Sequence, residues 1–230
     1  MDIETYSKLA PQYFADEAPN LVEGILRYNN FGTILDCGCG DGSLLYYIYK
    51  HKLQKKAQVY GIDLSQNRIN IAQKISRSFH LKVDSVETLS SVKNKSIDFL
   101  ISEQVIEHVD DQKMVNTLSR VSRPGAIIYL STVYKKWYGW YFYRNNIGWV
   151  LDPTHLREYT SDSQLLRHFK KDYWLVVNNK TLQWFPVVDF FLKRLGLTSR
   201  MRDGKLWSMV RSLKIPIIGY YLWELIFIKK

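Results

Sequence analysis

The sequence predicts an α/β fold in which a mostly parallel sheet is covered by helices on both faces. Short β-branched runs alternate with stretches of helical spacing over the first 133 residues, which is typical of that architecture. The first run leads into a glycine-rich turn and then a helical stretch, as expected where a strand is followed by a tight turn. A chain of 230 residues is at the upper end of single-domain size, so we expect one domain over 1–230.

The first part of the chain supplies five candidate strands and the helices between them. The strands are expected at Thr33–Cys37, Gln58–Asp63, Leu81–Val83, Ile97–Ser102 and Ala126–Val133. Helical spacing is found over Ser43–His51, Ser65–Phe79 and Asp111–Val121, with Ser65 and Asp111 as expected N-caps. Pro124 and Gly125 predict a turn into the fifth strand.

The pattern becomes looser after Val133. Tyr134–Val150 is an aromatic segment interrupted by Gly and Asn, which favours a mobile flap or an interfacial segment. A helix is expected near Ser161–Phe169, and strands are expected at Trp174–Leu182 and Tyr221–Ile228.

Composition indicates an ordinary globular protein, with 46% hydrophobic and 23% charged residues. No apolar run is long enough to span a bilayer, and the N-terminus is too polar for a signal peptide, so a cytoplasmic location is expected. Cys37 and Cys39 are too close for an ordinary disulfide and lack a second pair that would complete a zinc site. A reducing compartment fits these cysteines.

Positive charge and tryptophan are concentrated in the C-terminal part. Residues 1–133 carry 15 Lys/Arg and 15 Asp/Glu, whereas residues 134–230 carry 17 and 7 and contain all seven tryptophans. One interpretation is a solvated basic surface over a core that contains tryptophan. The other is a face that meets an anionic amphiphile, a membrane surface or a nucleic acid.

The string Ile34–Gly42 carries the strongest functional signal, with glycines at 38, 40 and 42. These glycines let the backbone turn with positive φ and approach a ligand closely. Ser43 stands where a dinucleotide fingerprint requires its third glycine. Asp36 and Asp41 would repel a pyrophosphate but suit a ligand with an ammonium and a sulfonium. S-adenosylmethionine carries both cations and no phosphate.

This string resembles the first motif of class I S-adenosylmethionine-dependent methyltransferases, and the resemblance continues over residues 33–133. It implies a Rossmann-like fold with a seven-stranded, mostly parallel sheet in which the strand Tyr221–Ile228 runs antiparallel between two others. It also implies an N-terminal helical lid over 1–32, a cofactor-binding half over 33–133 and a substrate-side half over 134–230. The implied cofactor is S-adenosylmethionine.

The resemblance assigns cofactor contacts residue by residue. Asp63 ends the second strand and is expected to accept both ribose hydroxyls as a charge-assisted pair. Asp84 is expected near the adenine amino group, and the backbone at Ser102 near the methionine part. The remaining cofactor positions are Asp36, Gly38, Cys39, Gly40, Leu64, Ser85 and, near the N-terminus, Tyr13.

Glu107-His108-Val109 resembles a signature of small-molecule methyltransferases related to those of quinone biosynthesis. Some of them add a glutamate three residues before the Glu-His pair to hold a divalent metal, but Gln104 stands there. A neutral amide is a poorer ligand for a hard cation, so no obligatory metal is expected. His108 and His155 are candidate general bases for a hydroxyl acceptor. The alternative for each is a histidine that holds a helix or loop by a hydrogen bond.

The segment from Asp152 to Ser161 resembles one that follows strand five in type 11 and type 23 methyltransferases and lies over the active site. His155, Arg157 and Tyr159 are therefore substrate candidates, with Trp137 from the aromatic segment. A structural role, with Thr160 or Ser161 as a helix cap, is equally open for the residues of this segment.

The apolar and cationic residues of the C-terminal part favour an amphiphilic acceptor methylated at oxygen, such as a lipid-linked sugar, a quinone precursor or a fatty acid. They also fit a peripheral membrane contact. RNA is the second candidate acceptor.

A non-catalytic scaffold of the same fold is a third hypothesis, although a scaffold has no need of the glycines, Asp36 and Asp63. A nicotinamide-dependent oxidoreductase is disfavoured by the glycine spacing. No Asn/Asp-Pro-Pro-Tyr/Phe motif follows the fourth strand, and no cysteine lies outside the glycine turn, which argues against amino-group and cytosine-C5 methylation.

Overall fold

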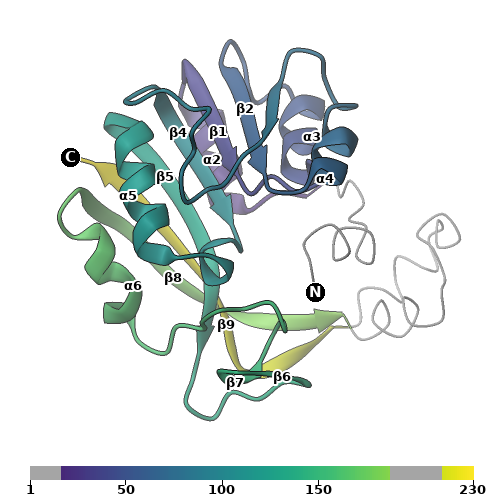
Figure 1. Ribbon diagram of the computed structural model, residues 1–230, viewed down its shortest axis with the longest axis vertical. Helices are drawn as coiled ribbons and strands as arrows, with labels where there is room; N and C mark the ends of the chain where they lie inside the picture. The colour runs from purple at the N-terminus through teal and green to yellow at the C-terminus, as the bar shows by residue number, and fades with distance from the viewer. Residues whose placement is uncertain (1–16, 187–213) are drawn as a thin grey trace, which may run out of the picture.

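The fold is built on a seven-stranded sheet in the order β3-β2-β1-β4-β5-β9-β8 (Figure 1). The computed structural model describes residues 17–186 and 214–230. The strands of the sheet are β1 (Thr33–Cys37), β2 (Gln58–Asp63), β3 (His80–Val83), β4 (Ile97–Glu103), β5 (Ser122–Lys135), β8 (Tyr173–Pro186) and β9 (Lys214–Lys229). A separate hairpin pairs β6 (Tyr143–Asn145) with β7 (Gly148–Val150).

Strand directions confirm the predicted topology. The pairs β1–β2, β1–β4, β2–β3 and β4–β5 are parallel. Strand β9 pairs antiparallel with β5 on one side and with β8 on the other. The carboxyl ends of β1 to β5 therefore meet at one edge of the sheet, where ligands of open α/β sheets bind.

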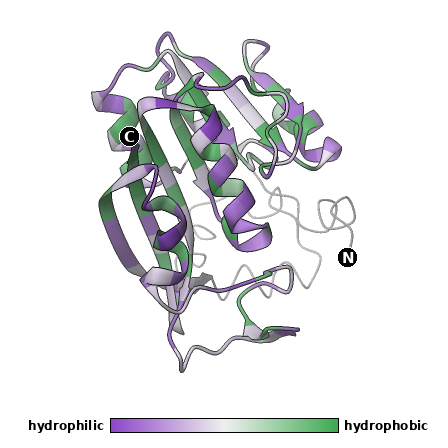
Figure 2. Ribbon diagram, turned by 60° about the vertical axis from the view of Figure 1, so that its left-hand side comes forward, coloured by the Kyte–Doolittle hydropathy of each residue, from purple (hydrophilic) through white to green (hydrophobic). Residues whose placement is uncertain are grey.

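Helices cover both faces of the sheet. The helices are α2 (Asn20–Tyr28), α3 (Ser43–Lys50), α4 (Gln66–Ala72), the 3₁₀ turn η1 (Ile106–His108), α5 (Asp111–Val121) and α6 (Asp162–Phe169). Apolar residues of α2, α3 and α4 form one core with Ile34, Phe99 and Tyr129 of the sheet. Those of α5 and α6 form the other core with Leu100 and Trp223. Strands coloured hydrophobic lie beneath helices with hydrophilic outer faces (Figure 2). No helix of the described ranges is long and apolar enough to cross a membrane.

One predicted helix end and one predicted N-cap were wrong. The helix expected over Ser65–Phe79 ends at Ala72, although its N-cap Ser65 is confirmed by a bond from the Arg68 amide. Beyond it, the Ser76 hydroxyl accepts the Ser78 amide at 3.2 Å, a local bond that competes with helical pairing. The cap of α5 is Asp110 rather than Asp111, because the Asp110 carboxylate accepts the Lys113 amide.

The last strands are longer than predicted, and the aromatic segment is partly regular. Strand β5 begins at Ser122, so Pro124 and Gly125 lie inside the strand and do not form the predicted turn before it. They fall where the pairing of β5 with β4 shifts its register, between Ile97 and Phe99 of β4. Strand β9 begins at Lys214. Its N-terminal half lies beside the β6–β7 hairpin, which forms part of Tyr134–Val150 (Figure 1). The expected helix near Ser161 is confirmed, with Ser161 and Gln164 forming a capping box.

Candidate functional site

The glycine turn is fixed to the end of β2 by backbone hydrogen bonds. The amides of Gly38 and Cys39 donate to the Ile62 carbonyl at 2.7 and 2.9 Å, and the Gly40 amide donates to Asp63 Oδ2 at 3.0 Å. Gly38 has φ +79°, and a Cβ there would lie 2.4 Å from Val105 Cγ2. The turn therefore requires glycine at position 38 for both conformation and space.

Asp63 lies where the sequence predicts it, at the carboxyl end of β2. Its Oδ1 accepts the Ser65 amide at 2.8 Å, and the carboxylate is 8% exposed. Leu64 beside it and Val83, its partner on β3, are each 43% exposed. The ends of β2 and β3 thus present a hydrogen-bonded carboxylate next to two exposed apolar side chains, which suits a ribose joined to a flat base.

Carboxylates gather at the same edge. Asp36, at the end of β1, is 3% exposed, and burial followed by repulsion from Glu103 and Asp63 raises its pKa well above the usual range. Burial followed by repulsion from Glu224 raises the pKa of Glu103 to about 7. A cationic ligand would relieve this repulsion and favour the ionised acids.

The remaining cofactor positions differ in whether their side chains already have hydrogen-bond partners within the protein. The Ser102 hydroxyl is fully buried without a hydrogen-bond partner, as expected of a group that bonds a ligand. Asp84 accepts the amides of Ser85 and Ser91 at 2.8 and 2.7 Å, so its carboxylate already holds its own loop. These bonds, against the opposing effect of burial, lower the pKa of Asp84. Tyr13 lies outside the described residues.

The described edge therefore fits S-adenosylmethionine by three independent features. It offers a backbone turn without Cβ, a set of acids that repel one another, and a buried hydroxyl that lacks a protein partner. When bound, the cofactor would supply an activated methyl group to this edge.

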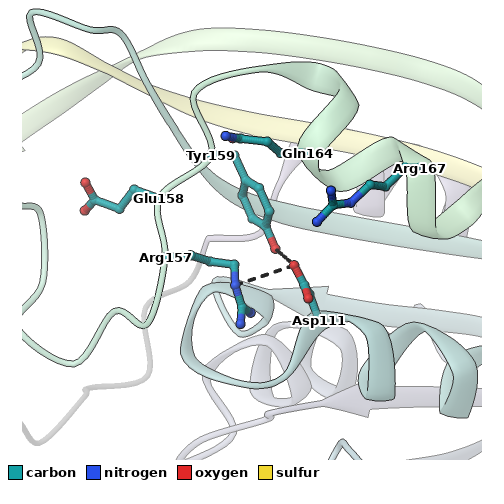
Figure 3. A pocket seen from close by; sticks show the side chains of 6 residues that line it. All are labelled: Asp111, Arg157, Glu158, Tyr159, Gln164 and Arg167. Carbon is teal, nitrogen blue, oxygen red and sulfur yellow. Dashed lines mark hydrogen bonds and ion pairs between the residues drawn. The ribbon is translucent and has the colours of Figure 1, made fainter. Parts of the chain in front are cut away.

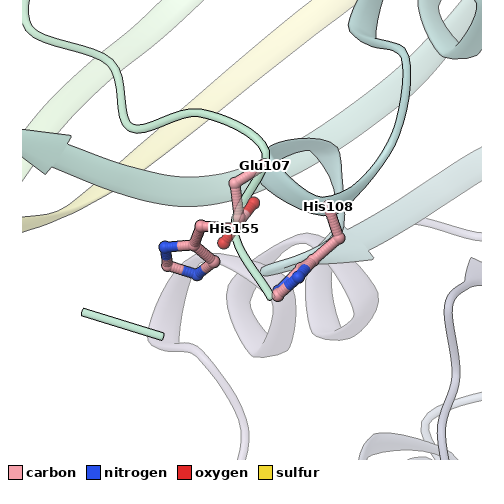
Figure 4. A group of neighbouring side chains, drawn as sticks. All are labelled: Glu107, His108 and His155. Carbon is pink, nitrogen blue, oxygen red and sulfur yellow. The ribbon is translucent and has the colours of Figure 1, made fainter. Parts of the chain in front are cut away.

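Beyond β4, the structure brings the two predicted catalytic histidines together with a glutamate. The rings of His108 and His155 lie 4.8 Å apart, centroid to centroid. One ligand atom from each of Glu107, His108 and His155 lies within 4.8 Å of the others (Figure 4). We call these three side chains the Glu–His–His cluster. Glu107 is fully buried, and this burial is the main reason why its pKa is raised to about 7.

Neighbouring groups orient both histidines of the cluster. The Thr154 hydroxyl lies 3.0 Å from His108 Nδ1 and 2.5 Å from Asp152 Oδ1. Because that carboxylate only accepts, the hydroxyl donates to it and accepts from Nδ1–H, which leaves His108 Nε2 with its lone pair. His155 Nδ1 lies 2.9 Å from Glu158 Oε1, and the same argument leaves its Nε2 free to accept. Burial, followed by repulsion from His155, lowers the pKa of His108.

The predicted substrate residues Arg157 and Tyr159 make internal contacts. Tyr159 is 2% exposed, and its hydroxyl donates to Asp111 at 3.2 Å. Arg157 donates to the carbonyls of Ile106 and Val109 and pairs with Asp111. Both line a cavity of about 210 Å³ together with Asp111, Glu158, Gln164 and Arg167 (Figure 3). Tyr159 and Arg157 thereby hold their segment against η1 and the start of α5.

A second cavity places Trp137 and Arg157 together. It has a volume of about 310 Å³ and is lined by Lys135, Lys136, Trp137, Ile147, Leu156, Arg157, Glu158 and Thr160. Three of these side chains are cationic and three are apolar or aromatic. We call it the cationic cavity. Its chemistry matches an amphiphilic acceptor with an acidic or polar group.

Sequence reasoning missed several partners at this site. Glu107 was noticed only as part of a motif, and Glu103, Thr132 and Glu158 were not singled out. The Thr132 hydroxyl donates to Glu107 Oε2 at 2.9 Å, a contact between residues 25 positions apart that no spacing rule indicates. The i, i+3 spacing of His155 and Glu158 was the one available signal.

Replacing Asp63 by alanine should weaken S-adenosylmethionine binding by about 1.5–3 kcal/mol, the range for hydrogen bonds to a charged group. From sequence alone, little change in stability is expected. The bonds from Gly40 and Ser65 add a structural cost, so Asp63→Asn, which keeps an accepting oxygen, should retain more stability than Asp63→Ala. Calorimetric titration and urea unfolding of both variants measure the two effects. Equal affinity in Asp63→Ala and the parent would show that the ribose site lies elsewhere.

Glu103 should make stability depend on pH. Its pKa is raised from 4.5 to about 7 in the folded protein, so the folded state holds this proton more tightly than the unfolded state. This contribution is therefore lost as pH rises through that window. Without cofactor, Glu103→Gln should gain stability relative to the parent at pH 8 compared with pH 5. Parallel denaturant curves at the two pH values test it, and an unchanged difference would place Glu103 in solvent.

Comparisons with known proteins agree with this geometry. A ubiquinone biosynthesis O-methyltransferase of Idiomarina loihiensis is 28% identical over 144 residues, which are 58% of this chain and 58% of that protein. One of Bartonella tribocorum is 24% identical over 175 residues, 72% of this chain and 68% of that protein. The chain thus spans about three fifths to two thirds of the length of these curated relatives.

The fold is shared with a solved coclaurine N-methyltransferase bound to N-methylheliamine and SAH. The TM-score is 0.65 at 14% identity, and the match covers 92% of this chain and 71% of that one. A family described as methyltransferase domain matches residues 30–180, which include the glycine turn, Asp63 and the Glu–His–His cluster. The chain therefore belongs to the methyltransferase-domain family and has the class I, Rossmann-like fold.

Proposed function

We propose that this protein transfers a methyl group from S-adenosylmethionine to a hydroxyl oxygen of a small, amphiphilic acceptor, of the class of quinone precursors. The observation that carries the proposal is the edge at β1 and β2, where Asp63 holds the glycine turn and faces a set of acids. The relatives that are ubiquinone biosynthesis O-methyltransferases support oxygen as the methylated atom.

The Glu–His–His cluster supplies what a hydroxyl acceptor requires. Methyl transfer from a sulfonium is an in-line displacement in which positioning provides much of the acceleration. A hydroxyl must in addition lose its proton, and groups that favour its loss contribute about 10²–10⁴-fold. His108 and His155, each with an accepting Nε2, are our proposed catalytic residues for that step.

The cationic cavity is our proposed entrance for the acceptor. It shares Leu156 and Arg157 with the segment that carries His155, so an acceptor seated there lies beside the cluster. The amide of Leu156 donates to the Glu107 carbonyl at 2.9 Å, which fixes this segment against the end of β4. Trp137, 91% exposed, lies at the open side, where it can cover an apolar tail.

A peripheral membrane contact is part of this proposal. The segment from Lys135 to Val150 exposes large apolar side chains, and the most exposed are Trp137 at 91% and Phe142 at 60%. Cations accompany them, with the Arg144 guanidinium 5.7 Å from the Trp149 ring. Aromatic rings favour the headgroup region, and cations favour anionic lipids. The N-terminal residues 1–32 stay proposed as a lid, of which α2 packs Val22 and Leu26 into the core.

Incubation of labelled S-adenosylmethionine with cell extract, followed by separation into lipid, RNA, protein and small-molecule pools, tests the proposed substrate class. Label should enter the lipid or small-molecule pool, and His108→Gln should reduce it strongly without weakening cofactor binding. Label in RNA would support the alternative, an RNA methyltransferase. No label in any pool, with the parent folded, would support a non-catalytic scaffold.

Vesicle sedimentation tests the membrane contact. The protein should pellet with anionic vesicles at low salt and less with neutral ones, because each cation near an anionic surface adds roughly 1 kcal/mol that salt screens. Trp137→Ala or Trp140→Ala should reduce the pelleted fraction. Trp174→Ala is a matched control, since Trp174 is 60% exposed but lies at the start of β8, outside the segment from Lys135 to Val150. A protein that stays in solution with anionic vesicles at low salt contradicts the proposal.

A further inference from the structure

We infer that the methyl acceptor carries an anionic group, a carboxylate or a phosphate, and that Lys136 binds this group in the cationic cavity. The cavity is lined by three cations, Lys135, Lys136 and Arg157. Two of them are paired with a carboxylate of the protein, whereas Lys136 is not. The inference rests on the proposed function and deepens it, because it names a group that the acceptor carries besides its hydroxyl and its apolar part.

The two paired cations are neutralised within the fold. Lys135 Nζ lies 3.5 Å from Glu158 Oε2 and donates to the Trp149 carbonyl. Arg157 Nε lies 3.5 Å from Asp111 Oδ2, and its Nη1 donates to two backbone carbonyls. Because acids of the protein balance both charges, neither cation calls for a charged ligand.

Glu158 is the carboxylate among the described residues that line the cavity, and both of its oxygens are engaged. Its Oε1 lies 2.9 Å from His155 Nδ1 and accepts the Leu151 amide at 2.6 Å. Its Oε2 accepts the Tyr220 hydroxyl at 3.0 Å. Together with the ion pair to Lys135, these contacts use about as many sites as an ionised carboxylate offers. Glu158 therefore has little capacity to balance a further cation.

The ammonium of Lys136 lies against aromatic rings instead of a carboxylate. Its Nζ is 5.3 Å from the centre of the Tyr134 ring and 6.0 Å from that of Tyr221. Among the described residues it has no ion pair or hydrogen bond, although the side chain is partly buried. Ring faces offset only part of the cost of removing an ammonium from water. An anionic ligand would supply the missing charge.

The backbone places Lys136 beside the segment that carries His155. The Lys136 amide donates to the Gly219 carbonyl of β9 at 2.8 Å, and the Lys135 amide donates to the Tyr159 carbonyl at 2.8 Å. The end of β5 is thus tied both to β9 and to the segment after His155. An acceptor whose acid lies at Lys136 is therefore held at a second point near the proposed base, and such positioning favours in-line transfer.

The rest of the cavity wall suits the apolar part of the same molecule. Trp137, Ile147 and Leu156 line the cavity, and all three are exposed. An anionic amphiphile gains from the apolar wall and from Lys136 together, whereas a neutral one of equal chain length gains from the apolar wall alone. The cavity should therefore discriminate between acidic and neutral acceptors.

Calorimetric titration of the full chain without cofactor tests the site with decyl phosphate and decanoate as anionic probes and decyl glucoside as the neutral one. We expect one-to-one binding of at least one anionic probe and much weaker binding of the neutral probe. The preferred acid distinguishes a phosphate from a carboxylate. Lys136→Gln should weaken anionic binding by at least about tenfold, the loss expected for a hydrogen bond between charged groups, and Lys136→Arg should retain it.

Lys170→Gln is the matched control, because Lys170 is an exposed lysine at the end of α6, outside the cavity, and this variant should bind as the parent does. Equal affinity for neutral and anionic probes, or parent-like affinity in Lys136→Gln, would overturn the inference. In the latter case, a loss of pelleting with anionic vesicles would assign Lys136 to a lipid headgroup instead.

The labelled product from cell extract gives a second readout, which stays decisive if a variant fails to fold. The product should be retained on an anion-exchange resin at neutral pH. A neutral product would overturn the inference and leave methyl transfer to oxygen standing. Binding of the anionic probes by a protein that transfers no methyl group would instead contradict the proposed function alone.

Discussion

The site depends on how the Asp63 carboxylate uses its two oxygens. One accepts the amide of Gly40 in the glycine turn, and the other accepts the amide of Ser65 at the start of α4. The carboxylate therefore adds to the backbone bonds from Gly38 and Cys39 to the Ile62 carbonyl and fixes the turn after β1 to the turn after β2. The glycines permit the approach, and the carboxylate maintains it. Burial of Asp36 and its repulsion from Glu103 and Asp63 then favour a cationic ligand at this edge.

A second constraint governs the proposed acceptor side. The chain after β7 returns to η1, where the Glu107 carbonyl accepts the Leu156 amide and Arg157 donates to the carbonyls of Ile106 and Val109. These bonds bring His155 to His108. They also form one wall of the cationic cavity, because Leu156 and Arg157 line it. Leu156 and Arg157 thus both hold the segment and line the cavity.

The sheet and its cofactor edge were predictable from sequence because they depend on local patterns. Alternating apolar runs give β1 to β5, and the terminal apolar run gives β9, whose antiparallel place between β5 and β8 the family resemblance implied and the structure confirmed. The end of α4 was missed, because serine side chains there bond locally. The length of β9 was missed because Pro216 and Gly219, which disfavour strand interiors, interrupt its first residues.

The acceptor side could not be predicted to the same depth. His108 and His155 were each predicted as bases. Their contact, however, depends on backbone hydrogen bonds that hold a loop in place, and such bonds cannot be predicted from residue types. Arg157 and Tyr159 were named for a substrate, yet the tertiary fold gives Tyr159 a buried position and engages both with Asp111. Long-range contacts of this kind arise from the fold as a whole and leave no periodic signal in the sequence.

Calorimetric titration of the parent protein with S-adenosylmethionine and, separately, with NADH tests the central claim most directly, because both ligands carry an adenosine but only one carries a cationic sulfur and ammonium. The acids at the carboxyl edge predict saturable, one-to-one binding of S-adenosylmethionine and no detectable heat with NADH. Binding of NADH, or of neither ligand by a folded protein, would contradict the account.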